Sequence, residues 1–493
     1  MMKGQISKTM LSCLAMILGI ASAQACGSQS VSETPIDTRE LTVAPVSAQI
    51  SHEATEYSFT VKANFEYKVV IDVDWISVKS ASRTALVLNI EENRSESSRE
   101  ADIRLVDEND RYWFKAVKVV QDKNPVQTLR LSIVDKNATA QTKALYANLW
   151  ALADKGFMFG HHDDLWYGRH WYNEPGGSDT KAVCGDYPAV FSVDLASIMD
   201  NRYLSDSKEN EIRRRVILEA RERGEVIIAC IHINNPLTII GAGDYPQGSS
   251  WDNTKCIDQI LKEGTEVRKR YIEWLDRLAD FANNLRDSKG ELIPVIFRPY
   301  HECTQSWSWW GTAACSATEY IQFWQWTVKY LRDTKGVHNF IYAVSPQMDG
   351  DYAENARARL LTRWPGDEYV DFIGMDCYHG LNYNAFAANI EAMRKLSSEK
   401  MKPCGVTETG AEAFTNSDYW TRYILGPAKG KRLSMVVMWR NKFVSSESDT
   451  HYFSVYPGHP SEDDFRTFYK DDSTLFSKDL PDMYSMPENY EVK

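Results

Sequence analysis

Leu292–Gly311 reads LIPVIFRPYHECTQSWSWWG and joins an apolar run to a cluster of ionisable and aromatic side chains. The run is almost continuously apolar, as in a parallel strand that is buried on both faces. Arg298, His301 and Glu302 follow it, and three tryptophans come next in a segment that Gly311 marks as a loop. An ionisable cluster after a buried strand is typical of the catalytic face of an α/β barrel. The alternative is a structural ion pair between Arg298 and Glu302.

Beyond Asn124, apolar runs of strand length alternate with amphipathic stretches, which is typical of βα repeats around a parallel sheet. The predicted strands are Phe157–Phe159, Ala189–Val193, Val226–Ile233, Leu292–Phe297, Phe340–Val344, Phe372–Met375, Cys404–Thr407 and Met435–Met438. Helical spacing of apolar residues predicts helices over Glu209–Arg223, Glu266–Leu285 and Thr318–Leu331. About eight strands close a (β/α)8 barrel, so we expect an α/β fold, a TIM barrel over residues 125–493.

Polar residues follow seven of these predicted strands. Any one group could be a cap or a satisfied core group. Together they predict one catalytic face, because the carboxyl ends of all barrel strands meet at the same rim. In chain order the groups are GHHDD at 160–164, Asp194, HINNP at 232–236, RPYHE at 298–302, MDCYH at 375–379, ETG at 408–410 and WRN at 439–441.

Ahead of the barrel, the pattern is one of short alternating runs separated by Asp, Asn and Ser. Period-two segments of this kind predict an all-β sandwich. We expect a small immunoglobulin-like sandwich over residues 43–124. Its predicted strands are Tyr57–Val61, Tyr67–Val73, Leu86–Ile90, Ala101–Leu105 and Trp113–Val120.

The amino-terminal residues carry the pattern of a processing signal. Lys3 and Lys8 precede an apolar stretch, Met10–Ile20, which has signal-peptide length and is too short to span a bilayer comfortably. We therefore expect a signal peptide over residues 1–25.

The end of this signal resembles a bacterial lipobox, because small residues directly precede Cys26. Ala23 stands where lipoboxes usually carry Leu, and the alternative is ordinary cleavage after Ala25 with Cys26 unmodified. We expect lipid on Cys26, followed by a flexible tether over residues 26–42 that is rich in Ser, Thr, Glu and Pro. The expected location is the outer membrane, facing the cell surface, with the periplasmic side as the alternative.

The composition narrows the range of partners. The formal net charge of −12 over 493 residues argues against nucleic acid and anionic membrane surfaces, and leaves neutral polymers open. The cysteine spacings match no zinc pattern. Cys303 and Cys315 bracket the tryptophan loop, and whether they pair is open. We expect a monomer that needs no metal or cofactor.

Two carboxylates at barrel-strand ends, among Trp and His side chains, are what glycoside hydrolysis requires. One carboxyl group must protonate the leaving oxygen, and the other must attack or activate water. Thirteen of the fifteen tryptophans lie in the barrel region, and aromatic faces stack on the apolar faces of sugar rings. Core packing is the alternative reading for tryptophans on predicted helices, namely Trp274, Trp324 and Trp326.

Seven ordered motifs resemble the β-mannanases of glycoside hydrolase family 26, from about Thr128 to about Tyr484. They are FGHHDDLWYG at 159–168, GDYPAVFSVDL at 185–195, IHINNP at 231–236, FRPYHE at 297–302 with its SWSWWG tail, DCYH at 376–379, TETG at 407–410 and MWRN at 438–441. This resemblance implies a retaining hydrolase, with Glu302 on the fourth strand as the acid/base and Glu408 on the seventh as the nucleophile.

The sandwich region resembles the BACON domain, a module found beside carbohydrate-active enzymes. The matching features are Asp74-Trp75-Ile76, Leu86–Glu92 with Asn93-Arg94, Arg99-Glu100-Ala101 and Val119-Val120-Gln121. Such a module could bind glycan or space the enzyme from the membrane.

The mannanase resemblance also implies supporting roles. Tyr378 is expected to donate a hydrogen bond to Glu408. Burial beside Trp307, together with the charge of Glu408, should raise the pKa of Glu302. The other expected substrate-binding or supporting residues are His162, His232, Trp251, Arg298, His301, Trp439 and Arg440.

The expected function is a retaining endo-β-1,4-mannanase acting on mannan, galactomannan or glucomannan. Two departures from the family pattern, Cys303 and Gln347, are expected near the substrate and leave chain-length preference open. The alternatives are an exo-acting enzyme that releases mannobiose, a β-1,3-xylanase or mixed-linkage glucanase of the same family, and a surface glycan-binding protein without catalysis.

Overall fold

The computed structural model describes residues 38–95, 97–125, 128–200, 207–239, 248–350, 355–378, 381–446 and 449–493. The expected signal peptide and Cys26 lie outside this part of the chain. The chain divides into two compact units, residues 1–126 and 127–493. Among the described residues, no helix combines the length and apolar character needed to cross a membrane.

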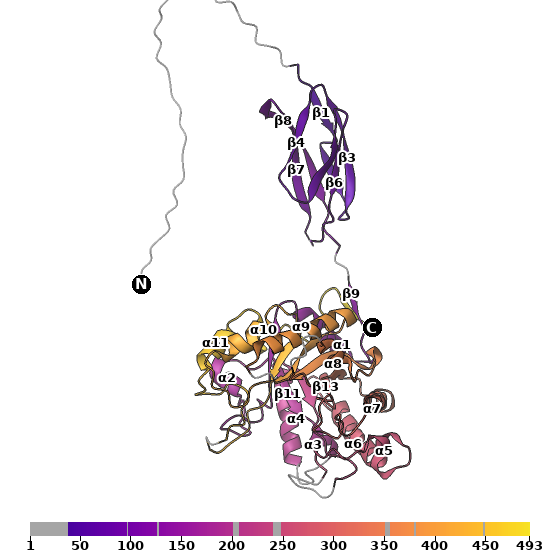
Figure 1. Cartoon of the computed structure of the whole chain (residues 1–493), viewed down its shortest axis with the longest axis vertical. Helices are drawn as coiled ribbons and strands as arrows, with labels where there is room; N and C mark the ends of the chain where they lie inside the picture. Colours follow the sequence, from indigo (N-terminus) through magenta and orange to yellow (C-terminus); the bar gives the residue numbers. More distant parts are fainter. Residues whose placement is uncertain are drawn as a thin grey trace, which may run out of the picture. The chain divides into compact units, whose positions relative to one another are not determined.

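The first unit is a sandwich of two four-stranded sheets (Figure 1). One sheet has the order β1-β3-β6-β5 and the other β2-β8-β7-β4. Their inner faces share one apolar core around Phe59, Leu88 and Ile103. The strands are β1 (Leu41–Ala44), β2 (Ser47–Ile50), β3 (Thr55–Ala63), β4 (Tyr67–Ile71), β5 (Ile76–Ala81), β6 (Ala85–Ile90), β7 (Arg99–Asp107) and β8 (Asp110–Gln121).

The second unit contains a closed barrel of eight parallel strands in chain order, as the sequence predicts. Pairing of β10 with both β11 and β17 closes the ring. The strands are β10 (Phe157–His162), β11 (Val190–Asp194), β12 (Val226–Cys230), β13 (Val295–Arg298), β14 (Phe340–Val344), β15 (Phe372–Cys377), β16 (Cys404–Thr409) and β17 (Met435–Met438). Short accessory strands are β9 (Leu129–Leu131), β18 (Thr474–Leu475) and β19 (Tyr490–Val492).

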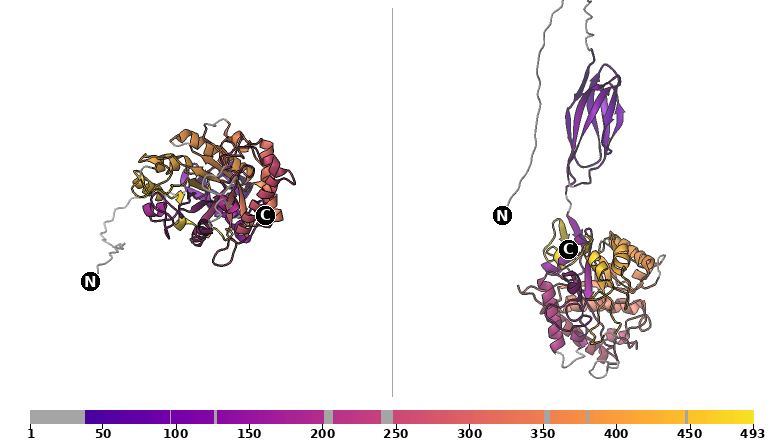
Figure 2. Two further views of the ribbon diagram at one scale, coloured as in Figure 1. Left: turned by 90° about the horizontal axis from the view of Figure 1, so that it is seen from below. Right: turned by 90° about the vertical axis from the view of Figure 1, so that its left-hand side faces the viewer.

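Helices surround these strands, as the end-on view in Figure 2 shows. The α-helices are α1 (Ala140–Leu152), α2 (Asp179–Cys184), α3 (Ala196–Asp200), α4 (Ser207–Glu222), α5 (Ile257–Leu261), α6 (Glu266–Asn283), α7 (Ala317–Lys329), α8 (Ala356–Leu361), α9 (Tyr383–Lys400), α10 (Gly426–Ala428) and α11 (Glu462–Tyr469). Shorter helical turns are η1 (Tyr330–Thr334), η2 (Asp367–Tyr369), η3 (Trp420–Leu425) and η4 (Ser477–Asp479).

Local chemistry explains where the helices begin. In α7 the side chain of Ser316 accepts from the amide of Glu319, and the Glu319 carboxylate accepts from the amide of Ser316. This reciprocal capping box satisfies two amides that the first helical turn leaves free. Thr265 caps α6 in a similar way by accepting from the Arg268 amide.

Register irregularities lie where β16 delivers its polar residues. The pairing of β15 with β16 shifts between Met375 and Asp376, so that Asp376 comes opposite Glu408. The pairing of β16 with β17 shifts between Val406 and Thr409. Such irregularities re-aim side chains at the rim of a barrel, and here they set two carboxylates side by side.

The observed elements differ from the sequence prediction at their ends. β12 stops at Cys230, and β13 begins only at Val295. The predictions missed β1, β2 and β5 of the sandwich and the accessory strands β9, β18 and β19. β5 lacks the expected alternation, because only its first residue, Ile76, is buried. β1 begins at Leu41 and so includes the last two residues of the expected tether.

Candidate active site

A cleft of about 560 Å³ opens at the carboxyl ends of the barrel strands. Most of the residues that the sequence predicts for the site line it. The lining residues are His232, Trp251, His301, Glu302, Trp307, Gln347, Tyr378, Glu408, Gly410, Ala411, Glu412, Trp439 and Phe453.

Glu408 lies near the end of β16 and is almost fully buried. One carboxylate oxygen, Oε1, accepts a hydrogen bond from the Arg298 guanidinium. The other, Oε2, accepts from the Tyr378 hydroxyl at 2.8 Å. Hydrogen bonds from a cation and a hydroxyl favour the ionised form of a carboxylate, so Glu408 is arranged to act as an anion.

Arg298 is fully buried at the end of β13 and joins Glu408 to a second carboxylate. Its Nη1 donates to Asp376 Oδ2 at 2.7 Å, while Asp376 Oδ1 accepts from Ser345 and Thr407 hydroxyls at 2.6 and 2.8 Å. Burial raises the pKa of Asp376, and Arg298 opposes that rise. Burial alone would lower the pKa of Arg298, but Asp376 and Glu408 raise it above its usual value. The cation therefore stays charged and fixes both acids.

Removing this cation should destabilise the barrel. Arg298→Met leaves two buried carboxylates without their partner, and breaking one side of a buried ion pair costs about 3–5 kcal/mol. We expect a loss of that size in the free energy of unfolding at neutral pH, measured by denaturant titration with tryptophan fluorescence. Arg357→Met is the matched control, because its pair with Glu399 is exposed on both sides and should be worth at most about 1 kcal/mol. Equal losses in the two variants would contradict the buried network.

Glu302 lies in the turn after β13, with 9 % of its surface exposed. Its Oε2 accepts a hydrogen bond from the Trp307 indole N–H at 2.5 Å. Burial and the neighbouring charge of Glu408 raise the pKa of Glu302 to about 7, against a smaller lowering by Trp307. The direction is the one that the sequence predicts, although Trp307 acts as a donor that opposes the shift. A carboxyl group with this pKa can give and take a proton near neutrality.

The turn that presents Glu302 has an unusual backbone. Tyr300 and Glu302 both have left-handed conformations, with φ of 51° and 52°. Such conformations cost about 1–3 kcal/mol each and persist where the surroundings fix them. Here the Glu302 amide donates to the Ser345 carbonyl at 2.7 Å, and the Tyr300 hydroxyl lies 3.0 Å from that of Thr327.

Two histidines lie beside the carboxylates. His301 Nε2 lies 3.1 Å from His232 Nε2 and 3.9 Å from Glu408 Oε1. His232 Nδ1 lies 2.7 Å from Asp194 Oδ2, at the end of β11. Burial lowers the pKa of His301 well below its usual value, so the ring is neutral.

Aromatic side chains form the walls of the cleft. Trp251 and Trp307 lie 4.7 Å apart between ring centroids, and Trp251 remains 67 % exposed. Across the rim, Trp439 stacks on the buried ring of His162 at 4.3 Å. Exposed indole faces at a cleft suit the apolar faces of sugar rings.

Arg440 follows Trp439 and belongs to a separate, partly buried network. Its Nη1 donates to the Tyr167 hydroxyl at 2.9 Å, and that hydroxyl donates to Asp163 at 2.5 Å. Burial raises the pKa of Asp163 to about 6, and Tyr167 opposes the rise. Buried His162 stacks behind Trp439, whereas Arg440 is partly exposed beside the lining residues of the cleft.

Two groups of possible metal ligands occur in the described residues, Asp194 with Cys230 and His232, and His301 with Asp376 and Glu408. Hydrogen bonds already account for both arrangements. Arg298 donates to both acids of the second group, and the Asp194 carboxylate engages His232 in the first.

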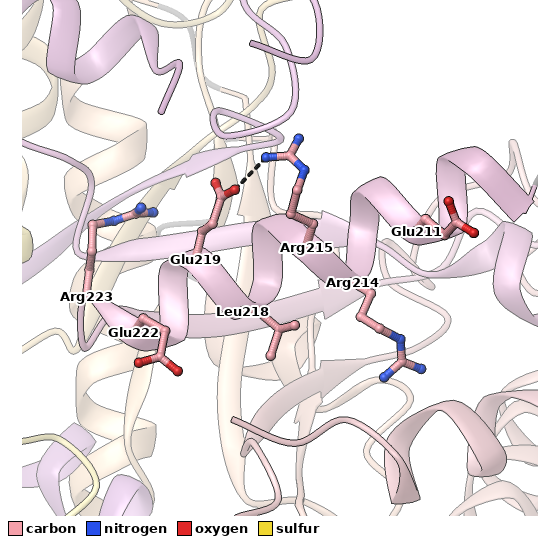
Figure 3. Close-up of a pocket in the computed structure, with 7 residues that line it drawn as sticks. All are labelled: Glu211, Arg214, Arg215, Leu218, Glu219, Glu222 and Arg223. Carbon is pink, nitrogen blue, oxygen red and sulfur yellow. Dashed lines mark hydrogen bonds and ion pairs between the residues drawn. The ribbon is translucent and has the colours of Figure 1, made fainter. Parts of the chain in front are cut away.

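A hollow of similar size, about 540 Å³, lies over the outer face of α4 (Figure 3). Its side chains are charged apart from Leu218, and the Arg215–Glu219 ion pair spans one helical turn. The pKa of Glu222 is lowered by a hydrogen bond from Ser288. Nothing here resembles a protonated acid beside an anion, so the chemistry lies at the barrel rim.

Sequence reasoning missed part of the cleft. Glu412 and Phe453 line it from the loops after β16 and β17, and no local pattern marks either residue. Gly410 is needed there, because it has φ of 149° and an added Cβ would lie 2.9 Å from the Phe453 side chain.

Gln347 and Cys303, the two departures from the family pattern, lie in different places. Gln347 lines the cleft, where its amide donates to Asp349 at 2.7 Å. The expectation for Cys303 is wrong, because its buried side chain lines a separate small cavity with Tyr320 and not the cleft. Cys303 and Cys315 are both free thiols, so no disulfide joins them.

Comparison with known proteins agrees with this architecture. The profile described as "Glycosyl hydrolase family 26" matches residues 134–413, more than half of the chain. The protein therefore belongs to glycosyl hydrolase family 26. The profile described as "Viral BACON domain" matches residues 40–120, which cover the sandwich.

Three relatives illustrate the likeness. The chain is 37% identical to a family 26 β-mannanase structure from Bacteroides ovatus, with a TM-score of 0.64, covering 71% of this chain and 98% of that one. It is 29% identical to a modular endo-β-1,4-mannanase from Cellulomonas fimi, with a TM-score of 0.64, covering 73% and 81%. It is 29% identical over 384 residues to a mannan endo-1,4-β-mannosidase of Bifidobacterium adolescentis, covering 72% of this chain and 37% of that protein. The chain thus matches little more than a third of the length of the Bifidobacterium relative.

Proposed function

We propose that this protein is a retaining endo-β-1,4-mannanase that hydrolyses mannan, galactomannan or glucomannan. The observation that carries the proposal is the contrast between two adjacent carboxyl groups in one cleft. Glu302 has a pKa raised to about 7 by burial and by Glu408, whereas Glu408 is held as an anion by Arg298 and Tyr378. An acid that can give a proton beside a carboxylate that accepts hydrogen bonds at both oxygens matches the acid and the nucleophile of a retaining glycosidase.

In the proposed first step, Glu408 attacks the anomeric carbon while Glu302 gives its proton to the departing glycosidic oxygen. In the second step, Glu302 takes a proton from water, which displaces Glu408 and releases a sugar of retained configuration. Tyr378 and Arg298 keep the attacking carboxylate oriented, and the indoles of Trp307 and Trp251 support the sugar rings. The mannanase names of the relatives support mannan as the substrate.

A product time course tests the substrate and the mode of attack. Linear mannohexaose should yield mannotriose, mannobiose and larger fragments from the earliest points, as an endo-acting enzyme requires. Mannobiose alone would indicate exo action. Inertness toward mannan, with turnover of β-1,3-xylan or mixed-linkage glucan in parallel assays, would overturn the proposed substrate.

We also propose that Cys26 carries lipid and anchors the protein in the outer membrane, facing the cell surface. The basic residues, the apolar stretch and the small residues before Cys26 support this. Cys26→Ala should move the protein from the membrane to the soluble fraction of the cells that express it. Protease treatment of intact cells should degrade the wild type, and protection would place it on the periplasmic side instead.

A further inference from the structure

Asp194 ends β11 and does not line the cleft, but hydrogen bonds fix its carboxylate against His232. Asp194 Oδ1 accepts from the Ala196 amide at 2.7 Å. Oδ2 accepts from the His232 amide at 3.2 Å and lies 2.7 Å from the His232 ring nitrogen Nδ1. An ionised carboxylate can only accept hydrogen bonds, so His232 Nδ1 must carry a hydrogen.

The hydrogen on His232 Nδ1 in turn determines which ring nitrogen of His301 carries a hydrogen. A neutral His232 that is protonated at Nδ1 has a lone pair at Nε2, 3.1 Å from His301 Nε2. Two lone pairs at that distance would repel, so His301 must carry its hydrogen at Nε2 and donate it to His232. His301 Nδ1 fits this assignment, because it is buried and has no hydrogen-bond partner among the described residues. A hydrogen on Nδ1 would be a buried, unsatisfied donor.

The tautomer of His301 matters because its Nε2 also lies near a carboxylate oxygen of Glu408. His301 Nε2 is 3.9 Å from Glu408 Oε1. With hydrogen on Nε2, the positive end of the N–H dipole is close to the carboxylate. In the other tautomer Nε2 would carry a lone pair in place of that hydrogen, and the ionised form of Glu408 would lose this stabilisation.

We propose that Asp194 is a positioning residue that, through His232, fixes the Nε2–H tautomer of His301 and so keeps a hydrogen, and not a lone pair, on the ring nitrogen that lies 3.9 Å from Glu408. This inference rests on the proposed role of Glu408 as the nucleophile. It concerns an aspartate that is not among the residues that line the cleft.

We call the chain from Asp194 through His232 to His301 the relay. Nitrogen NMR of the full-length protein with ¹⁵N-labelled histidine tests it directly, because the two tautomers of histidine have distinct ring-nitrogen chemical shifts. The wild type should show hydrogen on His232 Nδ1 and on His301 Nε2, with signals assigned by His232→Gln and His301→Gln. In Asp194→Asn the amide can donate to His232 Nδ1, which should reverse both tautomers. A wild type with hydrogen on His301 Nδ1, or an Asp194→Asn variant with unchanged tautomers, would overturn the proposal.

Kinetics give the functional readout. Asp194→Asn should lower kcat by roughly 100-fold, with less than a threefold change in KM. This loss is smaller than the ~10⁴-fold cost of a wrong histidine tautomer in a protease triad, because there the histidine itself transfers the proton. Asp194→Glu keeps a carboxylate and should recover part of kcat. Asp200→Asn is the matched control, because its carboxylate accepts from the Asn234 amide at 3.1 Å outside this relay, and it should retain wild-type kcat.

A double mutant of Asp194 and His301 distinguishes the relay from general structural damage. In a His301→Gln background the Asp194→Asn change should have little further effect on kcat, because contacting residues of one network are not additive. A full 100-fold loss in that background would overturn the relay. The tautomers are measured without substrate. A protein that does not hydrolyse mannan would therefore overturn the proposed function, but the NMR test of the tautomers would remain valid.

Discussion

Glu408→Ala should abolish turnover of mannan, with a loss in kcat of at least ~10⁴-fold, because the proposed reaction cannot form its covalent intermediate without this carboxylate. The cleft should still bind manno-oligosaccharides, since its aromatic walls are intact. Initial rates on mannohexaose, with calorimetric binding of the same sugar, measure both quantities.

The matched control for this variant is Glu412→Ala. Glu412 also lines the cleft, four residues further along the chain, but its side chain is 55 % exposed and pairs with His451 at 3.1 Å. We expect a change in kcat of less than about tenfold for Glu412→Ala, because that group lies outside the buried network. Near wild-type rates in Glu408→Ala would exclude Glu408 as the nucleophile.

Glu302→Ala should be selective for the leaving group. Hydrolysis of mannan should fall by roughly 10²–10⁴-fold, the usual contribution of a general acid. A β-mannoside with a dinitrophenyl leaving group needs no proton, so the first step with that substrate should remain fast. Equal losses on the two substrates, measured by stopped-flow release of the phenol, would contradict the role of Glu302 as the acid.

The pH profile follows from the raised pKa of Glu302. The acid must be protonated in the free enzyme, and burial with the Glu408 charge raises its pKa to about 7. The value of kcat/KM on mannan should therefore be at its plateau below about pH 7 and fall as the pH rises through it. This basic limb should disappear in Glu302→Ala on the dinitrophenyl substrate. A basic limb that persists unchanged would assign it to another group.

Much of the barrel and its rim could be predicted because both have strong local signals. All eight strands are short apolar runs, and each meets its neighbours in chain order. The carboxyl ends of all barrel strands meet at one rim, so Glu302, Glu408, Arg298 and Tyr378 could be expected to lie together without knowledge of the loops.

Other features depend on tertiary contacts that leave no local pattern. Exposed β5 has no alternation to detect. The cleft position of Phe453 depends on how the loops after β16 and β17 pack. The place of Cys303 could not be predicted either, because it follows a turn whose left-handed backbone at Glu302 has no local sequence signal.

The measurement that tests the central claim most directly is mass spectrometry of the enzyme trapped with a 2-deoxy-2-fluoro-mannoside carrying a good leaving group. The fluorine slows release of the covalent intermediate, so that the labelled peptide can be isolated after proteolysis. We predict one sugar per molecule, bound to Glu408. A label on another residue, or active enzyme that never becomes labelled and releases a product of inverted configuration, would contradict the account.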